Sequence, residues 1–124
     1  MKYKVIFVNW TAPFFNRNVN KEYQLPDYEI LINRVAILNA KKYLKVPVKL
    51  YTDDAGYSYY KEKNLINLFD EIDTDTLNEY NKKILNAGKW WTSGKSVVIG
   101  KEKPPFLFLD NDFIVRTTLP QKIF

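Results

Sequence analysis

Short apolar runs alternate with segments of helical character along the 124-residue chain, and this alternation constrains the fold more than any other feature. The apolar runs are 4–8 and 106–109, and two short segments with charged residues, 48–52 and 69–72, are interpreted as further strands. Continuous apolar runs of this length are typical of strands buried in a parallel sheet, which are joined by helical crossovers. The order β-α-β-α-β-α-β therefore predicts a single α/β domain over residues 1–124, a three-layer sandwich around a mostly parallel sheet.

The sequence also predicts the elements between the strands. Residues 9–24 are polar and contain Pro13, which is typical of a loop. A helix is expected to begin at Pro26-Asp27, and others over 57–68 and 77–99, although Gly88 and Gly94 weaken the last one. The run 106–109 is expected to be a fully buried strand. The buried face of the first long helix is expected to carry Tyr28, Leu31, Ile32, Val35, Ala36 and Leu38.

The composition excludes several kinds of chemistry. The chain has no Cys, which excludes disulfides, zinc-thiolate sites and thiol nucleophiles. It has no His, which excludes Ser-His-Asp catalysis and imidazole metal ligands. Any metal must therefore be bound by oxygen, which favours Mg²⁺, Mn²⁺ or Ca²⁺.

The chain has a net positive charge, and its cationic residues are scattered along the sequence. Lys and Arg number 19 against 14 Asp and Glu, a formal net charge of +5. A nucleic-acid surface would cluster these cations, so solvated lysines and a preference for an anionic ligand are the two readings left open. No apolar segment is long enough to span a bilayer, and residues 1–10 lack a signal-peptide cleavage site. We therefore expect a cytoplasmic protein.

Asp110-Asn111-Asp112 is the most informative group of polar residues, because it follows an apolar strand directly. Ligands of open α/β sheets bind outside the carboxyl ends of the strands. Two carboxylates two residues apart on a strand share one side, and a divalent cation relieves their repulsion. Such a cation can also bridge to phosphate oxygens. The alternative is a polar turn in which the acids bond to local backbone.

Other polar groups are expected at the same edge of the sheet. Asp53, with Asp54, ends the second strand, either as a helix cap or as a contact to a base or ribose. Lys95 is either solvated or bound to an anion. Adjacent residues on a helix cannot share a face, so of Trp90 and Trp91 one is expected in the core and one at a rim. The residues after the first strand, read either as loop or as ligand contacts, are Asn9, Trp10 and Thr11.

The segment from Gly94-Lys95 through a Lys/Glu/Pro link to residues 106–115 resembles the DXD-bearing nucleotide-sugar glycosyltransferases of the GT-A type, in particular small bacterial and viral members. In that family a helix with a basic residue precedes an apolar strand that ends in the motif, here Asp110-Asn111-Asp112. The strand that ends in Thr52-Asp53 is similar to the family's second strand. The likeness covers nearly the whole chain, and the acid triplet is its specific part.

The resemblance implies a GT-A/Rossmann-like fold that binds a nucleoside diphosphate sugar, with a UDP-sugar favoured, and transfers the sugar to an acceptor. Asp112 would bind Mn²⁺ or Mg²⁺ that holds the diphosphate, and Asp110 would contact the ribose, the sugar or that metal. Lys95 and Asn111 would lie beside the donor. The nucleotide pocket would be lined by Asn9, Trp10, Thr11 and Asp53. The catalytic base, the acceptor and the choice between retention and inversion stay open.

Members of the family continue well beyond the DXD strand, so the resemblance implies that this chain is the N-terminal, donor-binding half of the fold, either as a fragment or as a natural short form that binds a donor without transferring the sugar. A sheet edge left uncovered would favour self-association. The alternative function is a catalytically inactive module that binds a nucleotide or a protein partner through its aromatic surface. A basic nucleic-acid-binding domain is the third and least favoured reading.

Overall fold

The centre of the protein is an open sheet of four parallel strands. The structure, a computed structural model, describes residues 3–84, 86–87 and 89–117. Across the sheet the strands follow the order β3-β2-β1-β4, and each neighbouring pair is parallel. The predicted α/β class with a parallel sheet is thus confirmed for the described residues. The strands are β1 (Lys4–Asn9), β2 (Val48–Thr52), β3 (Glu71–Asp73) and β4 (Phe106–Phe108).

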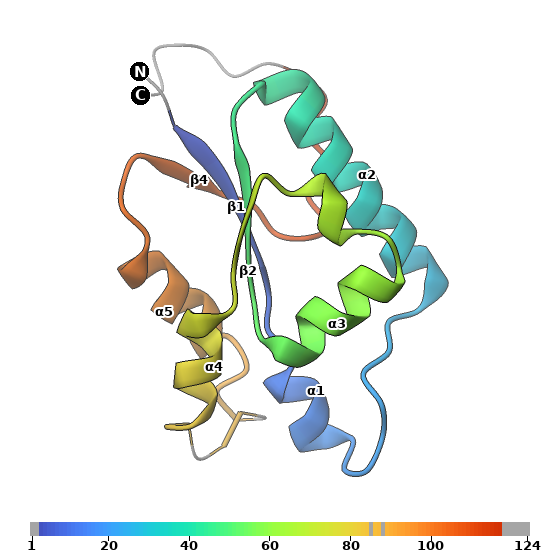
Figure 1. Ribbon diagram of the computed structural model, residues 1–124, viewed down its shortest axis with the longest axis vertical. Coiled ribbons are helices and arrows are strands. Elements are labelled where there is room, and N and C mark those ends of the chain that lie inside the picture. The colour runs from blue at the N-terminus through green and yellow to red at the C-terminus, as the bar shows by residue number, and fades with distance from the viewer. Residues whose placement is uncertain (1–2, 85, 88, 118–124) are drawn as a thin grey trace.

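Helices lie on both faces of the sheet, with α2 and α3 on one side and α4 and α5 on the other (Figure 1). The helices are α1 (Ala12–Arg17), α2 (Asp27–Leu44), α3 (Asp54–Glu62), the 3₁₀ turn η1 (Ile66–Leu68), α4 (Asp75–Asn81) and α5 (Ser93–Lys101). Over the described ranges, no helix combines the length and the apolarity that crossing a bilayer requires.

The two faces of the sheet carry apolar cores of different size. Because side chains alternate along a strand, Val5 and Phe7 of β1 point to one face and Ile6 and Val8 to the other. The first face meets α2 and α3 in the larger core. The smaller core, on the second face, contains Ile6, Val8, Tyr51, Leu77 and Val98.

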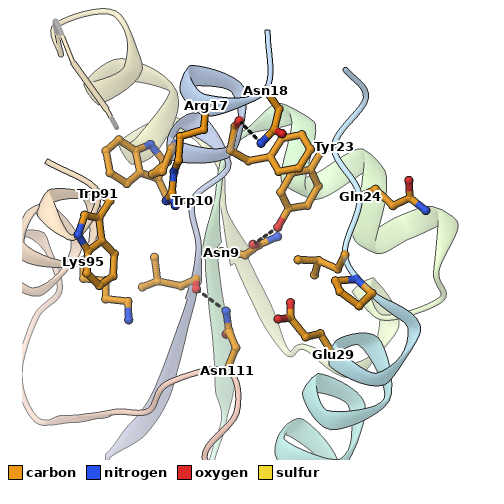
Figure 2. Close-up of a pocket in the computed structure, with 15 residues that line it drawn as sticks. Asn9, Trp10, Arg17, Asn18, Tyr23, Gln24, Glu29, Trp91, Lys95 and Asn111 are labelled. Carbon is orange, nitrogen blue, oxygen red and sulfur yellow. Dashed lines mark hydrogen bonds between the residues drawn. The ribbon is translucent and has the colours of Figure 1, made fainter. Parts of the chain in front are cut away.

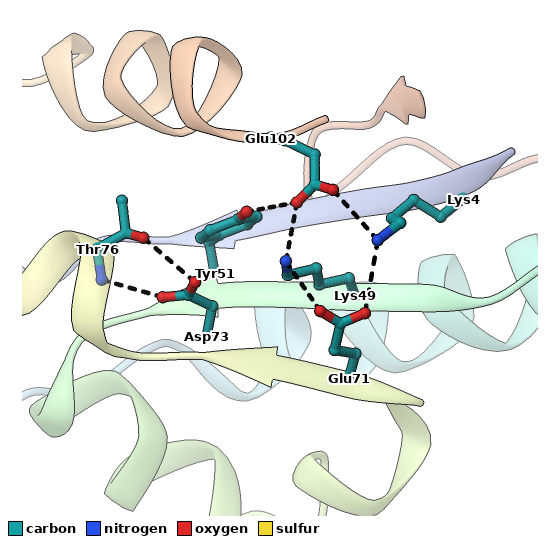
Figure 3. A network of polar contacts seen from close by, with 7 residues as sticks. All are labelled: Lys4, Lys49, Tyr51, Glu71, Asp73, Thr76 and Glu102. Atoms are coloured by element: carbon teal, nitrogen blue, oxygen red, sulfur yellow. Dashed lines mark hydrogen bonds and ion pairs between the residues drawn. The ribbon is translucent and has the colours of Figure 1, made fainter. Parts of the chain in front are cut away.

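A network of charges occupies part of the same face as the smaller core (Figure 3). Glu102, directly after α5, accepts hydrogen bonds from Lys49 Nζ at 2.8 Å and from the Tyr51 hydroxyl, and it pairs with Lys4 at 3.2 Å. Lys49 Nζ also lies 2.9 Å from Glu71. Burial alone would raise the pKa of Glu102, but these hydrogen bonds outweigh it and lower the pKa to about 2. The network ties the carboxyl end of α5 to β1 and β2.

The segment after β1 differs from the sequence prediction. Residues 9–24 were expected to form a loop, but Ala12–Arg17 form α1. Pro13, which indicated a loop, lies instead in the first turn of this helix, where its missing N–H costs no intrahelical hydrogen bond.

The predicted helix over 77–99 is also wrong, because two helices, α4 and α5, are separated by turns. Gly94 lies inside the first turn of α5, while Gly88 lies outside the described residues.

Smaller differences from the sequence prediction affect α3, β3 and β4. The helix expected over 57–68 begins earlier and ends at Glu62, and β3 lies slightly later than 69–72. β4 is a half-buried strand at the edge of the sheet, whereas a fully buried strand was expected.

The buried face of α2 was predicted only in part. Ala36 is buried as expected, but Tyr28, Leu31 and Leu38 are exposed. The helix carries two apolar stripes, and the one with smaller side chains packs on the sheet, since alanines allow the helix to approach more closely. The buried positions of α2 are Asn33, Ala36, Ile37, Ala40 and Leu44.

Candidate functional site

The carboxyl ends of β1 and β4 meet where the strand order reverses. β2 and β3 lie on one side of β1, and β4 lies on the other. The segment that leaves β1 leads to α2, and Leu109 and Val115 after β4 pack in the same core as α2. The residues that follow the two strands therefore lie at one edge of the sheet, and open α/β sheets bind ligands in a crevice outside the carboxyl ends of their strands. The main chain closes the floor of that crevice, because Leu109 N donates to Ile6 O at 3.0 Å.

A cavity of about 500 Å³ opens at this crevice (Figure 2). One wall carries Trp10, Trp91 and Lys95, and the opposite wall carries Tyr23 and Glu29. The other residues that line it are Val8, Asn9, Pro13, Phe14, Arg17, Asn18, Gln24, Leu25, Pro26 and Asn111. The cavity thus combines aromatic walls with side chains of both charges.

A second cavity of about 410 Å³ adjoins the first, since Asn9, Tyr23, Glu29, Lys95 and Asn111 are among the residues that line both. We call the two cavities together the β1–β4 cleft. Besides the shared residues and Leu25, the second cavity is lined by Tyr28, Ile32, Asn33, Asp110 and Asp112. The structure therefore brings most of the predicted site residues into one cleft.

The acid triplet forms a turn, so the strand spacing expected for its two carboxylates does not apply. β4 ends at Phe108, and Phe113 N donates to Asp110 O at 2.9 Å. Asn111 Nδ2 donates to Val8 O at 2.8 Å, which fixes the turn to the end of β1. Asp110 and Asp112 are both exposed and both line the second cavity, and Lys95 Nζ lies 2.9 Å from Asp110 Oδ1.

Thr11 and Asp53 lie at the same edge but outside the cleft. Asp53 is buried and caps α3, accepting a hydrogen bond from Gly56 N at 3.0 Å. Its carboxylate also accepts from the Thr11 hydroxyl at 2.8 Å, from Thr11 N at 3.1 Å and from Asn81 Nδ2 at 3.2 Å. Both carboxylate oxygens are thus occupied by the protein, and of the two readings of Asp53 the structure bears out the helix cap.

Asn9 and Trp10 connect the cleft to the interior. Asn9 Oδ1 accepts from the Tyr23 hydroxyl at 2.9 Å, and Asn9 Nδ2 is buried without a hydrogen-bond partner among the described residues. Trp10 Nε1 donates to Asn81 Oδ1 at 2.6 Å. A Cβ on Gly94 would lie 2.6 Å from ring atoms of Trp10, so only glycine lets α5 pack this closely on the indole. This contact places the first turn of α5, and with it Lys95, against the cleft.

The two adjacent tryptophans were expected to divide between core and rim, but Trp90 and Trp91 are both 58% exposed. They lie in the turns before α5 and not on a helix, so both side chains can face solvent. Trp91 lines the cleft and Trp90 does not.

The sequence did not single out several of the cleft residues, among them Arg17, Tyr23 and Glu29. Arg17 and Tyr23 belong to the segment after β1, and the rule that flagged residues 9–11 would have flagged them had it been applied to the whole segment. Burial, followed by the charge of Asp53, raises the pKa of Tyr23, so its hydroxyl stays protonated. Nothing in the sequence indicates that Glu29 faces the cleft.

The cleft is not a ready-made metal site. Across the residues that the structure describes, no group of three or more Asp, Glu, His or Cys side chains could hold a metal ion. Mg²⁺ is commonly held by one or two carboxylates together with water and phosphate oxygens. Of the two acids that line the second cavity, Asp110 is paired with Lys95.

Comparisons with protein-family models, with curated proteins and with solved structures found no match to this chain, so the resemblance to GT-A glycosyltransferases stays a prediction.

Proposed function

We propose that the β1–β4 cleft binds a nucleoside diphosphate sugar and that the protein takes part in glycosyl transfer. The observation that carries the proposal is the position of the cleft, where the strand order of a parallel sheet reverses. The order β3-β2-β1-β4 is that of the first four strands of dinucleotide-binding doubly wound folds. We assign these strands to the donor-binding half of a GT-A-type fold.

The lining of the cleft supports a nucleotide as ligand. Trp10, Trp91 and Tyr23 offer aromatic surfaces to a flat base, and stacking on such surfaces stabilises a bound base by about 1–3 kcal/mol. Lys95 and Arg17 supply positive charge for a diphosphate. An aromatic pocket with cations at its mouth suits a ligand that has both a base and phosphates.

The turn that contains Asp110 and Asp112 would make the proposed binding depend on a metal. Asp110 and Asp112 would hold Mn²⁺ or Mg²⁺ together with phosphate oxygens, and the metal's chemistry there is to stabilise negative charge on the departing diphosphate. Lys95 would move from Asp110 toward the phosphates when the nucleotide binds, because a diphosphate carries more negative charge than one carboxylate. Glu29, on the opposite wall, has oxygens suited to accepting hydrogen bonds from sugar hydroxyls.

Calorimetry with UDP-sugars tests the proposal. We expect saturable binding that requires Mn²⁺ and is weakened at least about tenfold by Asp112→Asn. The matched control is Glu62→Gln, an exposed carboxylate at the end of α3 that lines neither cavity of the β1–β4 cleft and should leave binding unchanged. No binding of any UDP-, GDP- or CDP-sugar, or binding indifferent to Asp112→Asn, would overturn the proposal.

The second candidate, a binding module without catalytic activity, is favoured by the ion pair between Lys95 and Asp110. That pair must open before Asp110 can bind a metal, whereas a module that binds an anion through Lys95 and the aromatic walls needs no metal. Product analysis separates the two candidates. An enzyme releases nucleoside diphosphate from the donor in the presence of Mn²⁺, and a module binds the donor unchanged with or without the metal.

A further inference from the structure

The outer side of α2 carries an apolar stripe that faces solvent. Tyr28, Leu31 and Leu38 are 64%, 61% and 44% exposed, and Val35 between them is half-buried. Large exposed apolar side chains are common singly, but a continuous row of them along one helix indicates a surface that binds another surface. We call these four residues the α2 stripe.

The spacing of the α2 stripe matches a helix partner. Positions 28, 31, 35 and 38 are separated by three, four and three residues, which is the a/d spacing of paired helices. This spacing is the same when it is read backwards. An identical helix that runs in the opposite direction therefore presents matching side chains, with position 28 opposite 38 and position 31 opposite 35.

The charges of α2 favour the antiparallel arrangement. Asp27 in the first turn and Lys42 in the last turn are both exposed, whereas Glu29 lines the cleft and Lys41 Nζ donates to Leu68 O at 2.8 Å. Antiparallel pairing brings the acidic end of one helix beside the basic end of the other and also opposes the two helix dipoles favourably. Parallel pairing would place like charges side by side, which disfavours it.

We infer that the α2 stripe is the interface of a two-fold symmetric homodimer in which the two α2 helices pack antiparallel. A contact in which the same surface of each copy meets is the commonest form of homodimer. Specific interfaces bury about 1,200–2,000 Å² in total, and a contact made by one helix of each copy is smaller, so it belongs to the weak, transient class. The dimer is therefore weak, with a dissociation constant on the order of 10 µM. The inference does not depend on the proposed function.

Sedimentation velocity on the full chain tests the interface. Over concentrations from about 1 µM to 1 mM, the wild-type protein passes from monomer to dimer. Leu31→Lys places a charge in the centre of the interface, and we expect it to weaken the dimer at least about 100-fold. The control is Ile99→Lys, which changes an exposed apolar residue on α5 and should leave the dimer intact. Circular dichroism checks that both variants are folded.

A wild-type protein that stays monomeric up to about 1 mM overturns the inference, and so does equal weakening by Leu31→Lys and Ile99→Lys. Exchange of charge then tests the direction of pairing. Asp27→Lys should weaken the dimer roughly tenfold, and adding Lys42→Asp in the same chain should restore it, because the two positions meet only across the antiparallel pair. Failure of the double variant to regain affinity overturns the antiparallel arrangement.

Discussion

Two acidic segments follow strands at the same edge of the sheet, and they differ in burial and in hydrogen bonding. Asp53, after β2, is buried, and its carboxylate accepts hydrogen bonds from Thr11, Gly56 and Asn81. Asp112, after β4, is exposed and has no hydrogen bond or ion pair with another described residue. A carboxylate whose oxygens are occupied by the protein stabilises the fold, and one without partners is free to bind a ligand.

The difference comes from what surrounds each segment. The end of β2 leads directly into α3, whose first turn needs an acceptor for its backbone N–H groups. The end of β4 leads into a turn at the edge of the sheet, with no helix to cap among the described residues that follow it. The same residue type is therefore structural at one strand end and available at the other.

Asp53→Asn is expected to have the largest effect on folding stability. It tests directly whether Asp53 is structural while Asp112 is not. The amide would direct its NH₂ group at the N–H or hydroxyl donors that now bond to the carboxylate. We expect the free energy of unfolding to fall by about 4 kcal/mol, because several buried donors lose their acceptor. Urea unfolding measures the change. The neighbouring Asp54→Asn, at an exposed position, should cost less than about 1 kcal/mol, and equal costs at both positions would contradict the interpretation.

Glu102 provides a second test of a structural carboxylate. It is buried and hydrogen-bonded like Asp53, but it lies away from the carboxyl ends of the strands. Its carboxyl is ionised in the folded protein down to about pH 2, and in the unfolded chain it takes up a proton near its ordinary value of 4.5. The stability that it contributes is therefore present above that ordinary pKa and is lost as the pH falls toward 2.

We expect Glu102→Gln to lower the free energy of unfolding at pH 7 by about 3 kcal/mol, since it leaves Lys49 without its buried partner. The difference between wild type and variant should shrink between pH 5 and pH 2. Chemical unfolding across this pH range measures it. A difference that stays constant with pH would mean that the network is not ionic.

Trp10 links the two acidic regions, because it lines the cleft and donates to the Asn81 side chain that also bonds Asp53. Gly94→Ala would push a methyl group into the Trp10 ring, so we expect a loss of about 2 kcal/mol of stability and weaker nucleotide binding. Gly100→Ala is the matched control, since a Cβ there meets nothing within 4 Å. It should stabilise α5 by about 0.5–1 kcal/mol. Similar thermal shifts for both variants would argue against tight packing at Gly94.

The smallest expected effect on stability is that of Asp112→Asn. We expect the free energy of unfolding to stay within about 0.5 kcal/mol of wild type, because the side chain is exposed and has no partner among the described residues. This is the same substitution as Asp53→Asn, so the two urea curves can be compared directly. A large loss at Asp112 would remove the distinction between the two segments.

Much of the fold follows from local patterns. β1 was predictable because a buried strand in a parallel sheet is apolar on both faces, and the start of α2 was marked by Pro26-Asp27. β2 was predictable although it contains Lys49, because its other residues are β-branched, apolar or aromatic. α1 was not predictable, because its Pro13 is typical both of loops and of first helical turns. The buried side of α2 was predicted only in part, since spacing alone cannot choose between two apolar stripes on one helix.

The site was predictable to the extent that it depends on strand ends. Asn9, Asn111 and the two acids of the turn lie together because parallel strands bring their carboxyl ends to one edge. The sequence could not separate Asp53 from this group, because its hydrogen-bond donors come from α3, α4 and Thr11, which are distant from one another in the chain. Glu29 could not be placed, since the orientation of α2 decides where it points.

The position of the tryptophans has a practical consequence. The chain has three, of which Trp10 and Trp91 line the cleft and Trp90 lies next to Trp91 in the sequence. Indole emission responds to polarity and to stacked neighbours, so any molecule that enters the cleft should alter the intrinsic fluorescence of the protein. The protein therefore carries its own optical reporter, and small-molecule libraries can be screened against it without a label.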